Sequence, residues 1–409
     1  MKRIDFQLEK LGRFFIVGYN KLTQFFDVAV LHNNEIKKVG AFSKGLSKEE
    51  HAVLLQVILN NSLTETTTFV NVKPGICVEL SYTSLENGHL KSPFFMNFLF
   101  DIEWTSCTLE KLTDSTPLIK NIKISHPDKP LFKDKTITKK DYLNYLQDVS
   151  PYMLPFLKER LLTVIRYPHG TYGDSFYQKN CPEYAPEFID TKMHEGINYI
   201  VCNNIETLYW LGNQLAFEFH IPFQTIHSNG PSEIVLDLDP PSRDHFHLAI
   251  KAAKILKEVF EGLKLITFIK TSGNKGLQIY IPLPENQFSY DQTRQFTEFI
   301  ADYLVTKEPT YFTTERLKKN RHNKLYVDYL QHAKGKTIVA PYSVRGNDGA
   351  FTATPLYWDE LADNLSIEAF PLDKTIQRLK EKGCPFQTYF EAKEKQKFEP
   401  VLHFLKQFN

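Results

Sequence analysis

The chain has 409 residues, 42% of them hydrophobic, so it is long enough to bury more than one core and to form two or three domains. Its 49 basic and 48 acidic residues nearly cancel, which excludes an overall basic field as the reason for binding a polyanion. The sequence has no apolar run of about 18 residues and no signal-peptide pattern, and its five scattered cysteines lack metal-ligand spacing. These features predict a cytoplasmic protein with no membrane contact.

The first hundred or so residues predict a small β-barrel. Apolar runs typical of strands, separated by asparagine-containing turns, lie at 14–19, 26–30 and 78–82. Ser47 and Glu50 have the spacing of a capping box and predict the start of a helix. One helix within a small barrel suggests an OB-fold over 1–108, followed by a polar linker over 109–120.

From 121 to 409 the sequence predicts an α/β domain. Thr138 and Asp141 predict a helix start, and further helices are expected at 206–217, 242–262 and 292–304. Strands are expected at 161–166, 199–201, 234–239, 265–269, 277–283 and 325–330. The tail after 366 predicts only a solvated helix near 390–397.

The most informative pattern is a pair of aspartates on an apolar strand. The two-residue period of a strand places Asp237 and Asp239 on one face, opposite Leu236 and its apolar neighbours. A third carboxylate, Asp328, interrupts the otherwise buried-looking strand expected at 325–330. Three aspartates on neighbouring strands would offer carboxylate oxygens to Mg²⁺ or Mn²⁺. Solubilising surface acids and a simple salt bridge are the alternatives.

Three further features suit a triphosphate. The loop 270–276 combines glycines with a hydroxyl and an ammonium group, so it could cradle phosphate, although an ordinary hairpin has the same pattern. Arg345 could neutralise phosphate charge or lie on the surface. His220, flanked by apolar residues, is either a hydrogen-bonded core histidine or a phosphate ligand.

Two segments suit nucleic acid. Residues 176–179 interleave aromatic side chains with a lysine, as expected where bases stack beside a bound phosphate, but core packing explains the same pattern. Lys129 and Lys139 lie in a lysine-rich stretch that suits either phosphate contacts or a solvated surface.

Taken together, these segments resemble the polymerase domain of bacterial ligase D, a member of the archaeo-eukaryotic primase superfamily. The resemblance extends over about 118–365 and includes 125–132, 138–139, 176–179, 218–220, 235–241, 270–283, 325–345 and 354–361. It implies a primase-polymerase catalytic domain that uses two Mn²⁺ or Mg²⁺ ions for phosphoryl transfer from nucleoside triphosphates.

The resemblance also implies residue roles. Asp237, Asp239 and Asp328 would be the catalytic metal ligands. The nucleotide would be bound by His220, Ser272, Lys275, Gln278, Arg345, Phe176, Tyr177 and Lys179, and a DNA 5′-phosphate by Lys129, Lys139 and His126. Two residues depart from the family pattern: Gln278 stands where a histidine is usual, and His126 where an asparagine is usual.

Residues 1–108 resemble the OB domain that follows the nucleotidyltransferase domain in ATP-dependent DNA ligases. The resemblance rests on 72–75 and on 90–101. No Lys-x-Asp-Gly motif occurs, so the lysine that would carry AMP is missing. The chain is therefore predicted to lack the nucleotidyltransferase domain and not to be a self-sufficient ligase.

The predicted function is template-dependent filling of DNA gaps and ends during non-homologous end joining. By resemblance, the partners would be DNA ends or gaps with a 5′-phosphate, a Ku homodimer and a separate ligase or nucleotidyltransferase domain, in the nucleoid region of a bacterial cytoplasm. The alternatives are a DNA ligase, a non-catalytic DNA-end-binding module, and the accessory half of a split ATP-dependent DNA ligase.

Overall fold

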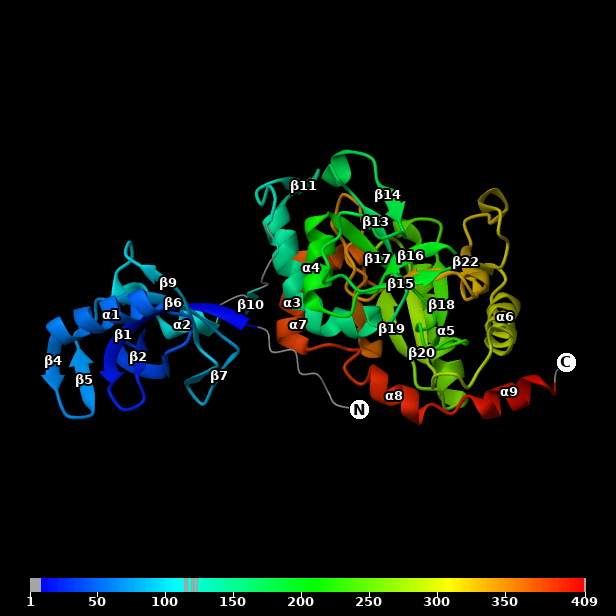
Figure 1. The fold of residues 1–409 in the computed structure, drawn as a ribbon. Coiled ribbons are helices and arrows are strands. Elements are labelled where there is room, and N and C mark those ends of the chain that lie inside the picture. Colours follow the sequence, from blue (N-terminus) through cyan, green and yellow to red (C-terminus); the bar gives the residue numbers. More distant parts are fainter. Residues whose placement is uncertain (1–8, 114–116, 119–121, 123, 408–409) are drawn as a thin grey trace. The chain divides into compact units, whose positions relative to one another are not determined.

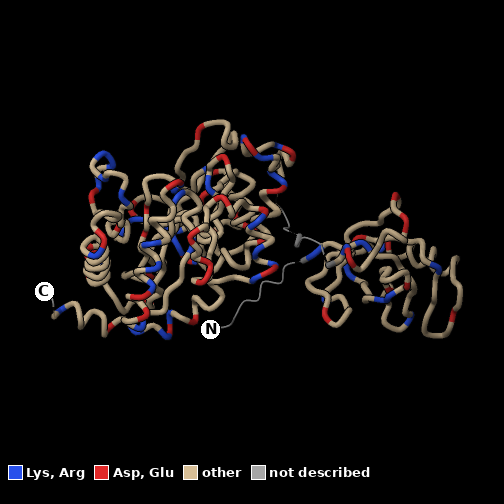
Figure 2. Tube along the Cα trace, turned by 180° about the vertical axis from the view of Figure 1, so that it is seen from behind, with Lys and Arg blue, Asp and Glu red and all other residues tan. Residues whose placement is uncertain are grey.

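The computed structural model describes residues 9–113, 117–118, 122 and 124–407 (Figure 1). The chain divides into two compact units, 1–121 and 122–409. Basic and acidic residues are interspersed along the second unit rather than sorted onto one region (Figure 2), so an anion site there has to be local. None of the helices in the described residues is long and apolar enough to cross a bilayer.

The first unit is built on an eight-stranded sheet. Its strands are β1 (Glu9–Asn20), β2 (Phe25–His32), β3 (Glu35–Phe42), β4 (Ser62–Glu65), β5 (Phe69–Val72), β6 (Cys77–Tyr82), β9 (Phe94–Leu99) and β10 (Pro117–Leu118). The strand order is β3-β2-β1-β5-β4, β6 pairs with β1 and β9, and β10 pairs with β1. A separate hairpin joins β7 (Ser84–Glu86) and β8 (His89–Lys91). The described pairings do not close a ring, so the OB-fold stays a prediction.

The predicted helix of this unit is confirmed as α1 (Lys48–Asn60). Ser47 Oγ accepts the Glu50 N–H, and the Glu50 carboxylate accepts the Ser47 N–H, which completes the capping box. Part of the predicted linker is ordered, since α2 (Leu109–Thr113) buries Leu112. Residues 114–116 and 119–120 of the linker lie outside the described residues.

The second unit is a mixed α/β structure with two main sheets. The four-stranded sheet has the order β14 (Phe176–Gln178), β13 (Thr163–Arg166), β17 (Ala216–Pro222), β23 (Thr337–Val339). The six-stranded sheet has the order β21 (Phe312–Thr313), β22 (Leu325–Asp328), β18 (Glu233–Asp239), β20 (Leu277–Pro282), β19 (Phe268–Thr271), β24 (Pro355–Leu356). Two hairpins are formed by β11 (Pro130–Phe132) with β12 (Lys135–Thr138) and by β15 (Thr191–His194) with β16 (Ile197–Ile200).

Seven α-helices accompany these sheets in the described residues: α3 (Lys139–Leu157), α4 (Ile205–Asn213), α5 (Phe246–Gly262), α6 (Tyr290–Lys307), α7 (Leu372–Lys382), α8 (Tyr389–Lys395) and α9 (Glu399–Leu405). Short 3₁₀ helices lie at Trp104–Ser106, Gly170–Tyr172, Arg243–His245, Lys318–Asn320, Tyr329–Gln331, Trp358–Glu360 and Ile367–Ala369. The capping box of Thr138 and Asp141 opens α3 as predicted.

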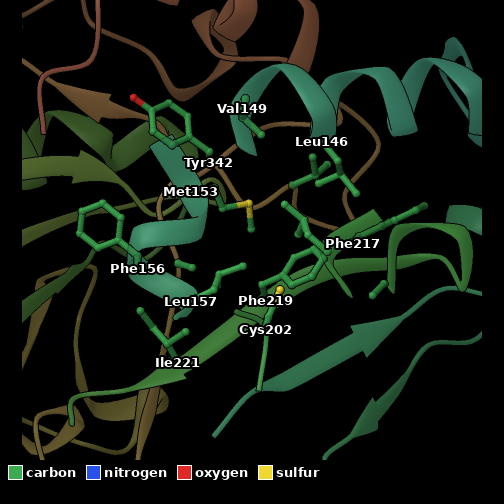
Figure 3. Packing of buried hydrophobic residues seen from close by; sticks show 14 of the residues in the cluster. Leu146, Val149, Met153, Phe156, Leu157, Cys202, Phe217, Phe219, Ile221 and Tyr342 are labelled. Carbon is green, nitrogen blue, oxygen red and sulfur yellow. The ribbon is translucent and has the colours of Figure 1, made fainter. Parts of the chain in front are cut away.

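Strand β17 divides its side chains between a core and a polar face. Phe217, Phe219 and Ile221 are fully buried, and they lie in the same cluster as the α3 residues Leu146, Val149, Met153, Phe156 and Leu157 (Figure 3). Because successive side chains of a strand point to opposite faces, Glu218 and His220 are directed away from this core. The candidate site therefore lies on the polar face of β17, the face that carries Glu218 and His220.

Strand β18 divides its side chains in the same way. Ile234, Leu236 and Leu238 are buried in a cluster with residues of α5 and α6, which leaves Asp237 and Asp239 on the other face. Each of these apolar side chains contributes about 1.5–3 kcal/mol by leaving water. A one-residue slip would bury Asp237 and Asp239 among apolar side chains, so the hydrophobic cluster specifies the register.

Two predicted elements differ from those found. The helix expected over 206–217 ends at Asn213, because Leu215 adopts φ +60 and Ala216 begins β17. The helix expected over 242–262 begins only at Phe246, because Ser242 precedes a 3₁₀ turn and its hydroxyl bonds His245 Nδ1 at 2.9 Å instead of capping α5.

The tail is a packed part of the second unit, which corrects the expectation of a solvated helix. Tyr389 and Phe398 are fully buried, and Val401 is 3% exposed. The Tyr389 hydroxyl donates to Glu233 Oε2 at 3.3 Å, at the start of β18. The sequence did not predict this buried face, because charged residues separate the apolar positions and the turn between α8 and α9 interrupts their helical spacing.

Candidate metal and nucleotide site

The three predicted aspartates meet on one face of the six-stranded sheet. In the antiparallel register, Asp237 lies opposite Asp328 of β22 on one side and opposite Gln278 of β20 on the other. Asp239 lies two residues further along β18, and therefore on the same face. The sheet thus brings Asp328 beside two aspartates that precede it in the sequence by 91 and 89 residues.

The surroundings disfavour ionisation of two of these carboxylates. Burial, followed by the charges of Asp239 and Asp328, raises the pKa of Asp237 to about 6. Burial also raises the pKa of Asp328. Hydrogen bonds from the Tyr326 hydroxyl at 3.2 Å and the Gln331 N–H at 3.0 Å lower this pKa but do not cancel the effect of burial. A divalent cation would compensate this concentration of negative charge.

Asp239 has cationic partners in this structure. Its carboxylate lies 2.9 Å from Lys275 Nζ and 3.4 Å from Arg321 Nη1. In the described part of the chain, no three His, Cys, Asp or Glu side chains are grouped so that they could hold a metal ion as they stand. The donor chemistry nevertheless fits a hard divalent ion; for all three carboxylates to contribute, Asp239 would exchange its contacts with Lys275 and Arg321.

A fully buried lysine supports Asp237 through Gln278. Gln278 Nε2 donates to Asp237 Oδ1 at 3.0 Å, and Lys270 Nζ donates to Gln278 Oε1 at 2.5 Å. Burial lowers the pKa of Lys270 well below its ordinary value, although the Asp237 charge opposes the shift. Sequence reasoning placed Lys270 only in a loop; the missed signal was a charged residue inside the apolar strand Phe268–Thr271.

The glycine loop between β19 and β20 folds around the Ser272 hydroxyl. Ser272 Oγ accepts the N–H groups of Asn274 and Lys275, each at 3.3 Å, and of Gly276 at 3.0 Å. Gly273 has φ +71, and a Cβ atom there would lie 2.6 Å from Arg345 Cγ. The loop therefore packs against Arg345, which brings three predicted triphosphate ligands together.

Glu218 organises the neighbouring sheet. Its carboxylate accepts hydrogen bonds from the Tyr167 hydroxyl at 2.9 Å and the Gly346 N–H at 3.1 Å, and it lies 3.0 Å from His220 Nε2 and 3.3 Å from Arg345 Nε. Burial alone would raise the pKa of Glu218, but the His220 hydrogen bond and the Arg345 charge outweigh it and lower the pKa to about 2. Burial lowers the pKa of His220, so its ring is neutral near pH 7 and Arg345 is the lasting counter-charge.

The two sheets contribute to one electrostatic site. Lys270 of β19 lowers the pKa of His220 on β17, and Arg345 lowers that of Lys270. The three aspartates, the loop and the Glu218 group thus lie within range of one another's charges.

A separate cationic group lies at the start of α3. Lys139 is 3% exposed, and its Nζ donates to the Ser125 carbonyl at 2.7 Å and to Ser125 Oγ at 3.0 Å. Burial, followed by the charge of Lys129, lowers the pKa of Lys139 to about 8. His126, with φ +50, begins the turn that leads to Lys129. The predicted 5′-phosphate residues are therefore neighbours, and Lys139 is not the solvated surface lysine of the alternative interpretation.

Comparison with known proteins identifies the family. Residues 138–386 match the family model described as LigD, primase-polymerase domain. The chain belongs to this family. It is 43% identical over 392 residues to the bifunctional non-homologous end joining protein LigD of Bacillus subtilis, covering 96% of this chain and 64% of that protein. The multifunctional LigD of Mycolicibacterium smegmatis is 30% identical over 269 residues, which are 64% of this chain and 35% of that protein.

A solved structure shows the same fold. The polymerase domain of Mycobacterium tuberculosis ligase D in complex with DNA superposes with a TM-score of 0.62 at 26% identity, over 68% of this chain and 100% of that one. This LigD-family chain spans less than two thirds of the length of the curated relatives from B. subtilis and M. smegmatis.

The predicted stacking residues of this LigD-family chain lie on the edge strand β14. Phe176 is 44% exposed and Tyr177 is 73% exposed, which contradicts core packing for both. Arg166 covers the Phe176 ring, with its Cζ 5.3 Å from the ring centroid. Tyr177 lies opposite Ile165, which lies opposite Glu218, so Tyr177 shares the face of the Glu218 group. Lys179 is set apart from that group and lines a different cavity.

Replacing Glu218 by glutamine tests its role in holding Arg345 and His220. The folded-state pKa is depressed, so the ionised carboxylate stabilises the fold above its unfolded pKa near 4.5, and this stability is lost as pH falls towards about 2. We expect Glu218→Gln to lose about 3 kcal/mol at pH 7, and the difference from the unmodified protein to shrink below pH 4.5. Urea unfolding at several pH values measures this difference in the free energy of unfolding. Replacement of the exposed Glu183 by glutamine is the control. A difference that is the same at pH 7 and pH 3 would contradict the assigned role of the Glu218 charge.

Proposed function

We propose that this chain is a template-dependent, primase-like nucleotidyltransferase that fills DNA gaps and extends DNA ends in non-homologous end joining. The observation that carries the proposal is the meeting of Asp237, Asp239 and Asp328 on one sheet face, beside the cationic groups of Lys275 and Arg345. Carboxylates beside a cation-rich loop are the arrangement that phosphoryl transfer from a nucleoside triphosphate requires.

The three aspartates would hold two Mn²⁺ or Mg²⁺ ions, which when bound would activate a 3′-hydroxyl and stabilise the leaving pyrophosphate. Lys275, Arg345 and Ser272 would bind and orient the triphosphate. A neutral His220 would offer a ring nitrogen for hydrogen bonding, held in place by Glu218. Gln278 keeps a hydrogen-bond donor where the family usually has a histidine, and it uses that donor on Asp237.

The exposed rings of Phe176 and Tyr177 would stack on the templating or incoming base, with Lys179 near a backbone phosphate. Lys129, Lys139 and His126 would hold the 5′-phosphate at the far side of a gap. The support for this assignment is the approach of two lysine side chains, close enough for Lys129 to lower the pKa of Lys139.

The low pKa of Lys139 predicts a pH-dependent preference for 5′-phosphorylated DNA. Lys139 is a cation below a pKa of about 8 and loses its proton as pH rises through that value. We expect the affinity advantage of a 5′-phosphate over a 5′-hydroxyl to decrease between pH 7 and pH 9. Fluorescence anisotropy with the two duplexes measures this advantage. Lys139→Met should have little advantage at any pH, and an unmodified protein whose advantage is constant up to pH 9 would refute the assignment.

Residues 1–108 would form an OB-type domain that binds DNA or docks a partner, joined by a linker at 109–120 to the polymerase domain at 121–409. The proposed partners are a Ku homodimer and a ligase or nucleotidyltransferase domain, because this chain has no Lys-x-Asp-Gly motif with which to adenylate itself. The relatives from B. subtilis and M. smegmatis are non-homologous end joining proteins by name, which supports placing the activity in that process.

Primer extension tests the proposal. The substrate is a gapped duplex with a 5′-phosphate, incubated with nucleoside triphosphates and Mn²⁺. We expect nucleotides complementary to the template to be added to the primer. A protein that binds the same DNA but adds no nucleotide would instead be a non-catalytic end-binding module, and the proposal would fail.

A further inference from the structure

A second polar cavity lies on the same sheet face as His220. It has a volume of about 340 Å³ and is bounded by β13, by the hairpin of β15 and β16, and by the segments around Gln224 and Lys334. Thr163, which lines it, is the register partner of His220. Pro222, also in the lining, lies two residues beyond His220 on β17, which is about 7 Å along a strand.

The cavity concentrates positive charge. Lys179, Lys192 and Lys334 line it from three separate segments, whereas Glu195 is the single carboxylate among its lining residues. Within the described part of the chain, none of the three ammonium groups makes a hydrogen bond or an ion pair, and Glu195 lies near His194 instead, at 3.7 Å. Three ammonium groups around one cavity, with a single carboxylate in its lining, favour the binding of an anion there.

The wall of the cavity also holds an unsatisfied hydrogen-bond acceptor. Gln224 lines it, and Gln224 Oε1 is buried with no partner among the described residues, while its Nε2 donates to the Ser228 carbonyl at 3.2 Å. A buried acceptor without a donor costs about 1–3 kcal/mol. A ligand that supplies both a negative charge and an N–H or O–H group would satisfy the lysines and Gln224 together.

We propose that this cavity binds a phosphorylated nucleotide unit, with its phosphate on Lys179, Lys192 and Lys334 and a sugar hydroxyl or base amino group on Gln224. This inference extends the proposed function. The unit belongs either to a single strand that leaves the nucleotidyl-transfer site or to a free nucleotide. The strand is favoured by Tyr177, whose exposed ring lies two residues before Lys179 and can stack a neighbouring base.

Binding of two labelled probes distinguishes the sources: a twelve-residue oligo-dT and a fluorescent AMP. The double variant Lys192→Gln/Lys334→Gln leaves the aspartates and the glycine loop intact. At 0.1 M salt we expect it to bind the strand about 10–30-fold more weakly, and the slope of log K against log salt to fall by about 1.4, for two lost phosphate contacts. Lys264→Gln, an exposed lysine after α5, is the matched control and should change neither quantity.

Each outcome decides the inference. Weaker binding of the oligonucleotide alone supports a strand site, and weaker binding of AMP supports a free-nucleotide site. A double variant that binds both probes within twofold of the unmodified protein overturns the inference. Gln224→Met is the second test: it should weaken binding while leaving the salt slope unchanged. Primer extension separates this result from the proposed function, because a chain that adds no nucleotide but loses oligo-dT binding in the double variant would retain the cavity site and lose the polymerase assignment.

Discussion

Replacing Asp237 by asparagine is expected to reduce nucleotide addition at least about 10²–10³-fold, the usual loss when one preorganised electrostatic group is removed from an active site. The same change should leave the fold as stable or make it more stable. Burial and two neighbouring aspartates raise the pKa of Asp237 to about 6, so its charge is unfavourable in the metal-free fold at neutral pH. We expect a gain of about 1–2 kcal/mol in the free energy of unfolding, allowing for the partial exposure of the side chain.

The pH dependence of that gain follows from the raised pKa. Below the unfolded-state pKa of about 3.8, the carboxyl group is protonated in both states and does not destabilise the fold. As pH rises through the folded-state pKa of about 6, the buried group ionises and this stability is lost. The metal-free variant and the unmodified protein should therefore differ little at pH 4 and increasingly up to pH 7. Asp302→Asn, on the exposed side of α6, is the control. An Asp237→Asn protein that retains full extension activity would contradict the assignment of this residue.

Replacing Arg160 by leucine is expected to cost about 3–5 kcal/mol of stability, because it leaves a buried carboxylate without its counter-charge. Arg160 and Glu233 are 2% and 1% exposed, with Arg160 Nη2 2.8 Å from Glu233 Oε2. Arg160 Nη1 also donates to the Pro222 carbonyl at 2.5 Å, and Tyr389 bonds the same carboxylate. The pair therefore joins the segment after α3 to β17, β18 and α8.

A double variant separates the effect of the unpaired Glu233 charge from the effect of replacing the Arg160 side chain. Arg160→Leu/Glu233→Leu removes both charges, so we expect it to recover much of the stability lost in the single variant. Urea unfolding of the single and double variants measures the difference. If the free energy of unfolding of Arg160→Leu lay within about 1 kcal/mol of that of the unmodified protein, Glu233 would not be left unpaired in the folded state.

The alternation of residues along β18 was predictable because one hydrophobic cluster fixes it. Leu236 and its apolar neighbours can be buried only if Asp237 and Asp239 occupy the opposite face, so the shared face follows from the local pattern. The charged residue inside an apolar run made Asp328 a candidate third ligand, but its pairing with β18 could not be derived locally, since strand pairing across 91 positions depends on tertiary packing that no local pattern encodes.

Glu218 and Lys270 show what sequence reasoning could not resolve. Each is a charged residue within an apolar strand, which signals a buried partner without naming it. Their partners, Arg345 and Gln278, are distant in sequence or lie across a hairpin. The boundary between α4 and β17 was missed for a related reason: Leu211 and Leu215 keep the four-residue spacing of a helix, so the apolar positions at 215–217 suit a buried helix and a buried strand equally well.

Manganese binding tests whether Asp237, Asp239 and Asp328 hold metal ions. Titration of the protein with Mn²⁺, followed by the electron paramagnetic resonance of the free ion in the presence of a non-hydrolysable nucleoside triphosphate, gives the number of bound ions. We expect two bound ions per chain for the unmodified protein, fewer or weaker sites in Asp237→Asn, and no change in Asp302→Asn. Binding that is absent from the unmodified protein, or that is unaffected by the loss of Asp237, would contradict it.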